Sequence, residues 1–150
     1  MRWISATKTL IVLTSARRGG KAFATTNINM GDKIPTPYES GSNSVVFVTT
    51  PTKDAARKLA RCITEHKLAA CVNIIPQIES IYVWEGKVNE DSEYLMMIKT
   101  RTERIDELSK YVSENHPYSV AEVISLPIEN GNLPYLNWIR ETVPEKPVPK

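Results

Sequence analysis

The chain has 150 residues and a formal net charge of +2, and 41% of its residues are hydrophobic. This length corresponds to one domain with enough apolar side chains for a core, and no apolar run reaches the ~20 residues that a membrane-spanning helix needs. The charge is uneven, because residues 1–31 hold five Arg and Lys and no acid, a local +5 that leaves −3 on the rest. A mildly acidic domain of this kind is a poor candidate for a nucleic-acid partner.

The first 43 residues have the composition of a targeting leader and a linker, cleaved or disordered in the mature protein. Residues 1–31 are basic, rich in Ser and Thr and free of acids, which is typical of a mitochondrial or other organellar transit peptide. Two alternatives stay open, a weak secretory signal and an untargeted cytoplasmic tail. Residues 32–43 are rich in Pro, Gly and Ser, as linkers are. We therefore expect a folded domain over residues 44–143 and a Pro-rich tail at 144–150.

The domain begins with a short apolar run at Val45–Thr49, which predicts a strand covered on at least one face. Pro51 ends this strand, and Thr52 is a candidate N-cap for a helix that runs to about His66. Apolar residues recur in that segment at helical spacing, at Ala56, Leu59, Ala60 and Ile63.

The middle of the domain predicts a long β-hairpin around which the rest of the chain is organised. Apolar side chains alternate along its first arm up to Tyr82 and Trp84, and Glu85-Gly86-Lys87 supplies a turn before a second arm at Tyr94–Ile98. Pro76 cannot donate to a β-ladder, so we expect a bend or bulge there. The first arm exceeds the ~6 residues typical of strands. Its end should therefore overhang the sheet and pack against another copy of the chain.

The remaining elements complete a recognisable order. A second helix is predicted at 102–115, a strand from Tyr118 to Leu126, and a short final helix that Asn132 caps. The order β-α-β-β-α-β plus a C-terminal helix predicts an α+β fold, the ferredoxin-like split βαβ sandwich, with both long helices on one face of an antiparallel sheet. The uncovered face and the overhanging arm both favour oligomerisation.

Few residues carry recognisable chemistry. There is no Gly-rich phosphate loop, GxSxG or CxxC motif, and Cys62 and Cys71 lie in different predicted elements, so we expect free thiols. Cys71 has the pattern of a buried strand residue, with a metal or redox role as the alternative. His116-Pro117-Tyr118 lies at a helix-to-strand corner that can place an imidazole in a crevice. Glu122 shares a predicted strand side with apolar residues, where a carboxylate needs a cation, a metal or a buried donor.

Five sequence runs together are similar to one family: LAACVNIIPQIESIY, WEGKV, LMMIKT, HPYSVAEVISLPIENGN and YLNWI. They resemble the CutA family of divalent-cation-tolerance proteins over about residues 44–143. The resemblance implies a ferredoxin-like protomer in a tight homotrimer, a role in tolerance of copper and other divalent cations, and no secure enzymatic reaction. In such a trimer we expect Tyr82, Trp84 and Trp138 at the interface.

The resemblance also implies metal ligands. His116 and Glu122 match positions implicated in metal binding in the family, and Cys71 matches its AAC motif. Bacterial relatives with a copper site have a cysteine near the end of the first strand, where this chain has Thr49-Thr50, and the loss of a soft thiolate weakens binding of copper(I). The expected cofactor is therefore a weakly bound divalent cation, copper or zinc. An extended strand would separate His116 from Glu122 by roughly 20 Å, so a shared ion should lie between subunits.

Two functional hypotheses follow. The first is a non-enzymatic homotrimer that binds a divalent cation or a small ligand in clefts between subunits, with a role in metal tolerance or signalling. The alternative is a trimeric scaffold or chaperone-like interaction module, with a vestigial metal site and a protein partner that the sequence does not identify. An enzyme is the least supported class, because no nucleophile has a base at a spacing that the sequence reveals.

Overall fold

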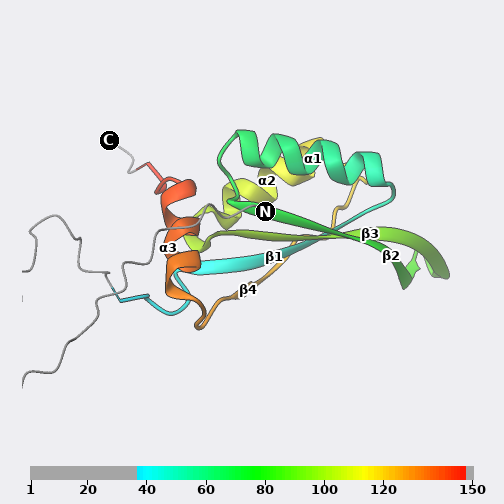
Figure 1. Cartoon of the computed structure of the whole chain (residues 1–150). Coiled ribbons are helices and arrows are strands. Elements are labelled where there is room, and N and C mark those ends of the chain that lie inside the picture. The colour runs from blue at the N-terminus through cyan, green and yellow to red at the C-terminus, as the bar shows by residue number, and fades with distance from the viewer. Residues whose placement is uncertain (1–36, 148–150) are drawn as a thin grey trace, which may run out of the picture. The chain divides into compact units, whose positions relative to one another are not determined.

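The computed structural model describes residues 37–147, and every structural statement below concerns these residues. The expected leader, the first part of the expected linker and the last three residues of the tail lie outside the described residues. Four strands and three α-helices form the described chain (Figure 1), in the order β1 Asn43–Thr50, α1 Lys53–Glu65, β2 Cys71–Trp84, β3 Lys87–Arg101, α2 Ile105–Asn115, β4 Ile124–Pro127 and α3 Leu133–Thr142.

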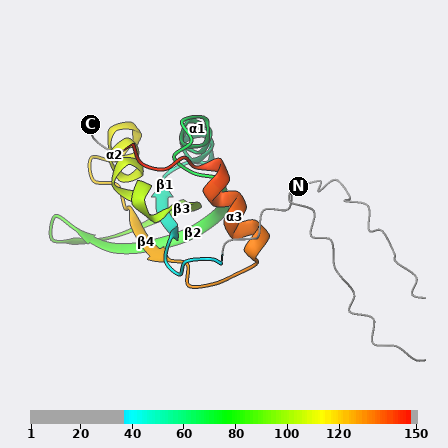
Figure 2. The same ribbon diagram turned by 90° about the vertical axis from the view of Figure 1, so that its left-hand side faces the viewer.

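The strands form one sheet in the order β2-β3-β1-β4, and every neighbouring pair is antiparallel. Helices α1 and α2 lie side by side over one face of this sheet, and α3 stands at the end of the sheet opposite the hairpin tip (Figures 1 and 2). This arrangement confirms the expected α+β, ferredoxin-like fold with its additional C-terminal helix.

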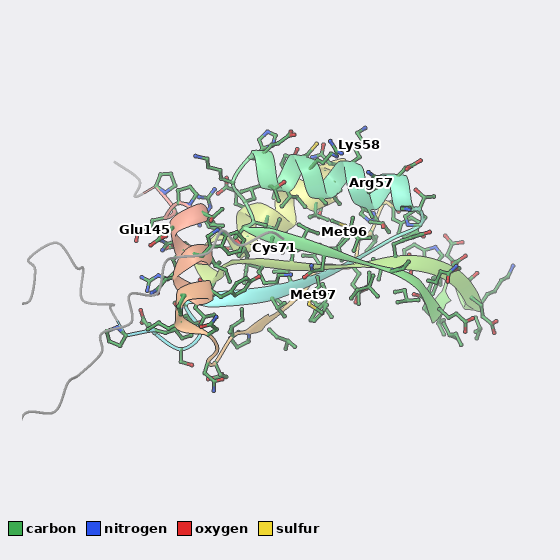
Figure 3. All side chains as sticks on the ribbon, in the orientation of Figure 1. Arg57, Lys58, Cys71, Met96, Met97 and Glu145 are labelled. Atoms are coloured by element: carbon green, nitrogen blue, oxygen red, sulfur yellow. The ribbon has the colours of Figure 1, made fainter. Side chains whose placement is uncertain are left out.

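The core lies between the sheet and the two long helices. Met96 and Ile98 of β3 pair with Val48 and Val46 of β1, and all four side chains are fully buried. Figure 3 shows Met96 on the helix side of the sheet and Met97 on the opposite side, as strand alternation requires. The helices complete this core with Ala56, Leu59, Ile63, Leu108 and Val112.

The opposite face of the sheet carries no helix among the described residues. Phe47 and Met97 are half-buried at its centre, whereas Ile124 and Leu126 of β4 are 55% and 59% exposed. Single exposed apolar residues are ordinary, but a row of them across neighbouring strands marks a surface made for contact. We call this surface, with its centre at Phe47, Met97, Ile124 and Leu126, the open face.

The hairpin is longer than its sequence pattern predicts. The expected second arm covered Tyr94–Ile98, but β3 begins at Lys87, because the polar stretch before Tyr94 pairs with the outer half of β2. We call the outer part of the hairpin, residues 78–93, the arm. It is two-stranded and extends past the helices (Figure 1). Glu85 and Gly86 form its turn with φ values of 49° and 78°, the left-handed geometry that matches the twist of a tight hairpin.

A β-bulge interrupts β2 at the position that the sequence predicts. The ladder pairs Ile75 with Leu95 and then Ile78 with Glu93, which leaves Pro76 and Gln77 out of register. This bulge makes one expectation wrong. The apolar residues that alternate along β2 up to Tyr82 and Trp84 do not all lie on one side of the strand. Ile78 lies on the same face as Ile75, so Tyr82 and Trp84 beyond the bulge share that face and not the face of Ile74.

Two other boundaries differ from the expected ones. The expected helix at 102–115 begins as a 3-10 turn at Thr102–Arg104 that leads into α2 at Ile105, and the Thr102 hydroxyl bonds to Ser44 Oγ and to the carbonyl of Gly41 and does not cap the helix. The last strand is Ile124–Pro127 and not Tyr118–Leu126. Residues 118–123 leave the sheet because the Tyr118 N–H donates to His116, which holds the chain in a turn.

Thr52 is the N-cap of α1, as predicted, and accepts a hydrogen bond from the Ala55 N–H at 3.1 Å. The end of the expected linker also contacts the domain, since the Tyr38 hydroxyl donates to the Ile128 carbonyl at 2.8 Å. Among residues 37–147, no helix is long and apolar enough to span a membrane.

Candidate functional site

His116 follows the last residue of α2, and its backbone is extended because Pro117 disfavours helical geometry in the residue before it. Its Nε2 lies 2.8 Å from the carbonyl oxygen of Thr49, at the end of β1, and its Nδ1 accepts the Tyr118 N–H at 3.1 Å. A carbonyl only accepts and an amide N–H only donates, so the network assigns a neutral imidazole with its hydrogen on Nε2. Both ring nitrogens are therefore engaged within the protomer.

Tyr118 extends from this corner to a buried carboxylate on β3. Its hydroxyl donates to Glu93 Oε1 at 3.0 Å, and Glu93 is only 5% exposed. Burial, followed by the hydrogen bond to Glu93, raises the pKa of Tyr118 to about 12. No ion pair within residues 37–147 involves Glu93. The Tyr118 hydroxyl therefore donates a hydrogen bond to Glu93, a carboxylate that would otherwise be costly to bury.

A second tyrosine and a second carboxylate lie beside this pair. The Tyr82 hydroxyl donates to Asp91 Oδ2 at 2.6 Å, and this bond is the main cause that raises the pKa of Tyr82. Asp91, Glu93 and Tyr82 also contribute, through their charges, to the raised pKa of Tyr118. We call Tyr82, Asp91, Glu93 and Tyr118 the tyrosine–carboxylate cluster. It extends along the arm from Glu93, next to the His116 corner, to Tyr82.

Sequence reasoning did not single out Asp91 or Glu93. A signal was present, because Glu93, Leu95 and Met97 alternate on one side of β3, and an acid in such a row needs a partner. It was missed because the second arm of the hairpin was expected to begin only at Tyr94.

Glu122 lies in the segment 118–123 between α2 and β4, where its side chain is exposed. The sequence predicts that Glu122 lies on an apolar side of a strand, but this segment is not a strand. The Glu122 carboxylate therefore stays in contact with solvent in the protomer. No hydrogen bond within the described residues joins Glu122 to His116.

Cys71 begins β2, where it pairs with Lys99 and lies close to Tyr135 of α3. Figure 3 shows it at the end of the sheet next to α3. Thr49, which holds His116, pairs with Leu95, and Lys99 lies four residues further along β3, a distance of about 13 Å. One ion bound by a single protomer therefore does not reach both Cys71 and His116. Both described cysteines are free thiols, as predicted.

The described residues of one protomer do not form a metal centre. No group of three or more His, Cys, Asp or Glu lies close enough to hold an ion within residues 37–147. The engaged ring of His116 agrees with this, since a metal would have to replace the Tyr118 N–H at Nδ1. A metal site built from the expected ligands therefore needs a second copy of the chain, and the roles of His116, Glu122 and Cys71 stay predictions.

The three expected interface residues have accessible side chains. Tyr82 is 41% and Trp84 is 48% exposed along the arm. Trp138 is half-buried on α3, with its ring 5.3 Å from the ring of Tyr135. Their burial between subunits stays a prediction.

The domain that contains this corner matches a known protein family. The family model of the CutA1 divalent ion tolerance protein matches residues 44–142. The Protein CutA homolog of Xenopus laevis is 57% identical over 108 residues, 72% of each chain. The Protein CutA of Homo sapiens is 56% identical over 104 residues, which are 69% of this chain and 58% of the human protein. The chain thus matches less than two thirds of some relatives' length.

Solved structures agree with these sequence matches. The crystal structure of CutA1 from Oryza sativa superposes with a TM-score of 0.68 at 53% identity, covering 69% of this chain and 95% of that one. The divalent cation tolerance protein of Thermus thermophilus gives 0.66 at 45% identity, covering 68% and 99%. The fold and these matches define a ferredoxin-like α+β protein of the divalent-cation-tolerance class. The chain belongs to the CutA1 family.

Proposed function

We propose that this protein is a non-enzymatic homotrimer that binds a divalent cation, copper or zinc, or a small ligand, in clefts between its subunits. Its role would be in metal tolerance or signalling. Membership of the CutA1 family supports the link to divalent cations. The protomer supports the assembly, because it leaves apolar surface uncovered in two connected places, the open face and the arm.

The arm is the observation that carries the proposal. Ile81, Val83 and Val88 are 69%, 70% and 68% exposed, on both strands of a ribbon that no helix covers. A two-stranded ribbon is marginally stable alone in water. Such an arm is stabilised when a second chain covers its apolar side chains, and bringing together several copies places each arm against a neighbouring subunit.

The metal ligands of this proposal come from two chains. His116 from one subunit and Glu122 from its neighbour would meet at a subunit boundary, and the exposure of Glu122 leaves it accessible there. Copper and zinc both accept imidazole and carboxylate ligands. Binding would require Nδ1 of His116 to release the Tyr118 N–H, which makes such a site weak. Cys71 lies at the other end of the sheet, so it would bind only a separate ion there.

A scaffold or interaction module is the second candidate, and a specific observation favours it. The hydrogen bonds at both ring nitrogens give His116 a complete structural role, which links the end of α2 to the end of β1. In that case the metal site is vestigial, and the trimer presents its surface to a protein partner.

Zinc and copper binding to the purified full-length protein separates the two candidates. Equilibrium dialysis should show binding to the parent and none to His116→Ala or Glu122→Gln. Trimers assembled from a mixture of these two variants should recover part of the binding, since some boundaries regain both native ligands. A parent that binds neither metal supports the scaffold. Binding by the parent without recovery in any mixture would rule out the shared site.

We also propose that the protein is organellar. The acid-free basic leader supports this, and two plant relatives bear names that include chloroplastic, from Oryza sativa at 54% identity and Arabidopsis thaliana at 44%. Sequencing the N-terminus of the mature protein from cells should find it between about residues 26 and 44. A mature protein that retains Met1 would contradict a cleaved leader.

A further inference from the structure

The geometry points to a second binding site, on the helix side of the sheet, for a small organic anion that carries a ring or another compact apolar group. A cavity of about 300 Å³ lies between the first turns of α1 and the sheet. Its lining is Lys53, Arg57, Ile74, Pro76 and Tyr94. None of these residues belongs to the metal site or to the interface proposed above, so this inference does not depend on the proposed function.

The cavity exists because two features of the fold coincide. The α1 helix begins at Lys53, so the helix layer ends there while β2 and β3 continue outward as the arm. The bulge at Pro76 interrupts the ladder at the same level, and the ring of Pro76 forms part of the floor. The space under the end of the helix is therefore left unfilled by the chain itself.

The wall and the floor of this cavity have different chemistry. Lys53 and Arg57 are four residues apart, which places them next to each other on one side of α1. Neither forms an ion pair or a side-chain hydrogen bond with any other residue of the described chain. Ile74, Pro76 and the Tyr94 ring supply an apolar surface opposite these cations. Small-molecule sites combine an apolar lining with a few converging polar groups in this way.

The two cations select the sign of the ligand, and the volume limits its size. A carboxylate or phosphate can accept charge-assisted hydrogen bonds from both Lys53 and Arg57 while its apolar part contacts the floor. A volume of about 300 Å³ is at the lower end of the range for small-molecule pockets, which suits a single ring with an acidic head group. Asp54 lies in the same helical turn but does not line the cavity.

Isothermal titration calorimetry of the full-length protein with phenyl phosphate tests the inference. We expect saturable binding of phenyl phosphate and weaker binding of inorganic phosphate, which lacks the ring, and of phenol, which lacks the charge. Benzoate tells whether the site prefers a carboxylate or a phosphate, and binding of either aromatic anion supports it. If neither phenyl phosphate nor benzoate binds, or if phenol binds as tightly as they do, the site is absent.

Three charge variants of α1 distinguish a site from general attraction to a basic helix. Arg57→Gln and Lys53→Gln should each weaken aromatic-anion binding by about tenfold, as the loss of one charge-assisted hydrogen bond predicts. Lys58→Gln removes the same charge from the same helix, but Lys58 does not line the cavity, and Figure 3 shows it on the side of α1 away from the sheet. The Lys58→Gln variant should bind aromatic anions with the same affinity as the parent. Equal losses in all three variants would overturn the inference.

Discussion

At the scale of single residues, the most informative contact is the hydrogen bond from Tyr118 to Glu93. This bond joins a loop to a carboxylate that is buried on β3. The sequence predicts that the loop is part of a strand. The same residue gives its backbone N–H to His116. Tyr118 therefore holds the His116 corner against the base of the arm, and its loss should affect both.

Tyr118→Phe should lower stability at neutral pH and change its dependence on alkaline pH. At pH 7 the variant leaves Glu93 buried without its donor, which costs about 1 kcal/mol of the free energy of unfolding. The folded pKa of Tyr118, about 12, is above its ordinary value of 10.0, so the phenol binds its proton more tightly when folded. The stability that results is complete below pH 10 and is lost as the pH rises from about 10 to about 12.

Because Phe does not ionise, the stability of Tyr118→Phe should fall less than that of the parent across this alkaline range. Urea unfolding curves recorded at pH 7 and at several values between about 10 and 12 provide the comparison. Other tyrosines titrate in both proteins, so the difference between the two curves isolates Tyr118. Parallel curves would mean that the hydrogen bond to Glu93 does not hold the phenol proton.

Sequence patterns located some residues of this site and missed others for a physical reason. The corner at His116 was predictable, because Pro117 fixes the local backbone after a helix with a clear apolar stripe. The distant partners of His116 and Tyr118 were not, since Thr49 is far away in sequence and Glu93 is buried only once β1, β3 and the loop at Tyr118 come together. Contacts of this kind depend on tertiary packing and leave no local signal.

At the scale of secondary-structure elements, the hairpin of β2 and β3 carries the main features of the protomer. Its turn and its bulge were predictable because Gly86 and Pro76 act locally on the backbone. The change of face at the bulge was not, because it depends on how many residues of β2 lie opposite β3. As a result, Tyr82 and Trp84 lie on the same face as Glu93, and Tyr82 joins the carboxylates there while Trp84 lies at the tip.

The turn of the hairpin should respond in opposite directions to two substitutions. Gly86→Ala should loosen the tip by about 1 kcal/mol, because an L-residue is disfavoured at a φ of 78°, although its added carbon would meet no atom within 4 Å. Glu85→Asn should tighten it, since Asn tolerates left-handed geometry at a φ of 49° better than Glu does.

Amide hydrogen exchange measures both changes. The amides of Tyr82 and Asn89, which face each other across the arm, should exchange faster in Gly86→Ala and more slowly in Glu85→Asn. Amides of the core strand β1 should be unaffected in both variants. The same exchange rates in both variants would show that the turn does not limit opening of the arm.

At the scale of the whole molecule, the protomer has two different sides. The helix side is closed over a compact core, apart from the cavity of about 300 Å³ under the end of α1. The other side is the open face, which the tyrosine–carboxylate cluster separates from Trp84 near the tip of the arm. The arm exposes apolar side chains on both of its faces, because Ile81, Val83 and Val88 lie on its helix side, and a protomer with this much uncovered apolar surface is suited to assembly.

The mass of the protein in solution tests this account most directly. Sedimentation velocity of the full-length protein over a range of concentrations should show one particle of three 16.9-kDa chains. Trp84→Ala should dissociate on dilution, because truncating an aromatic anchor typically costs ~2 kcal/mol or more at an interface. Glu85→Asn, which changes the tip without removing apolar surface, should stay trimeric. A parent that sediments as a monomer at every concentration, or a Trp84→Ala trimer as resistant to dilution as the parent, would contradict the proposed assembly through the arm.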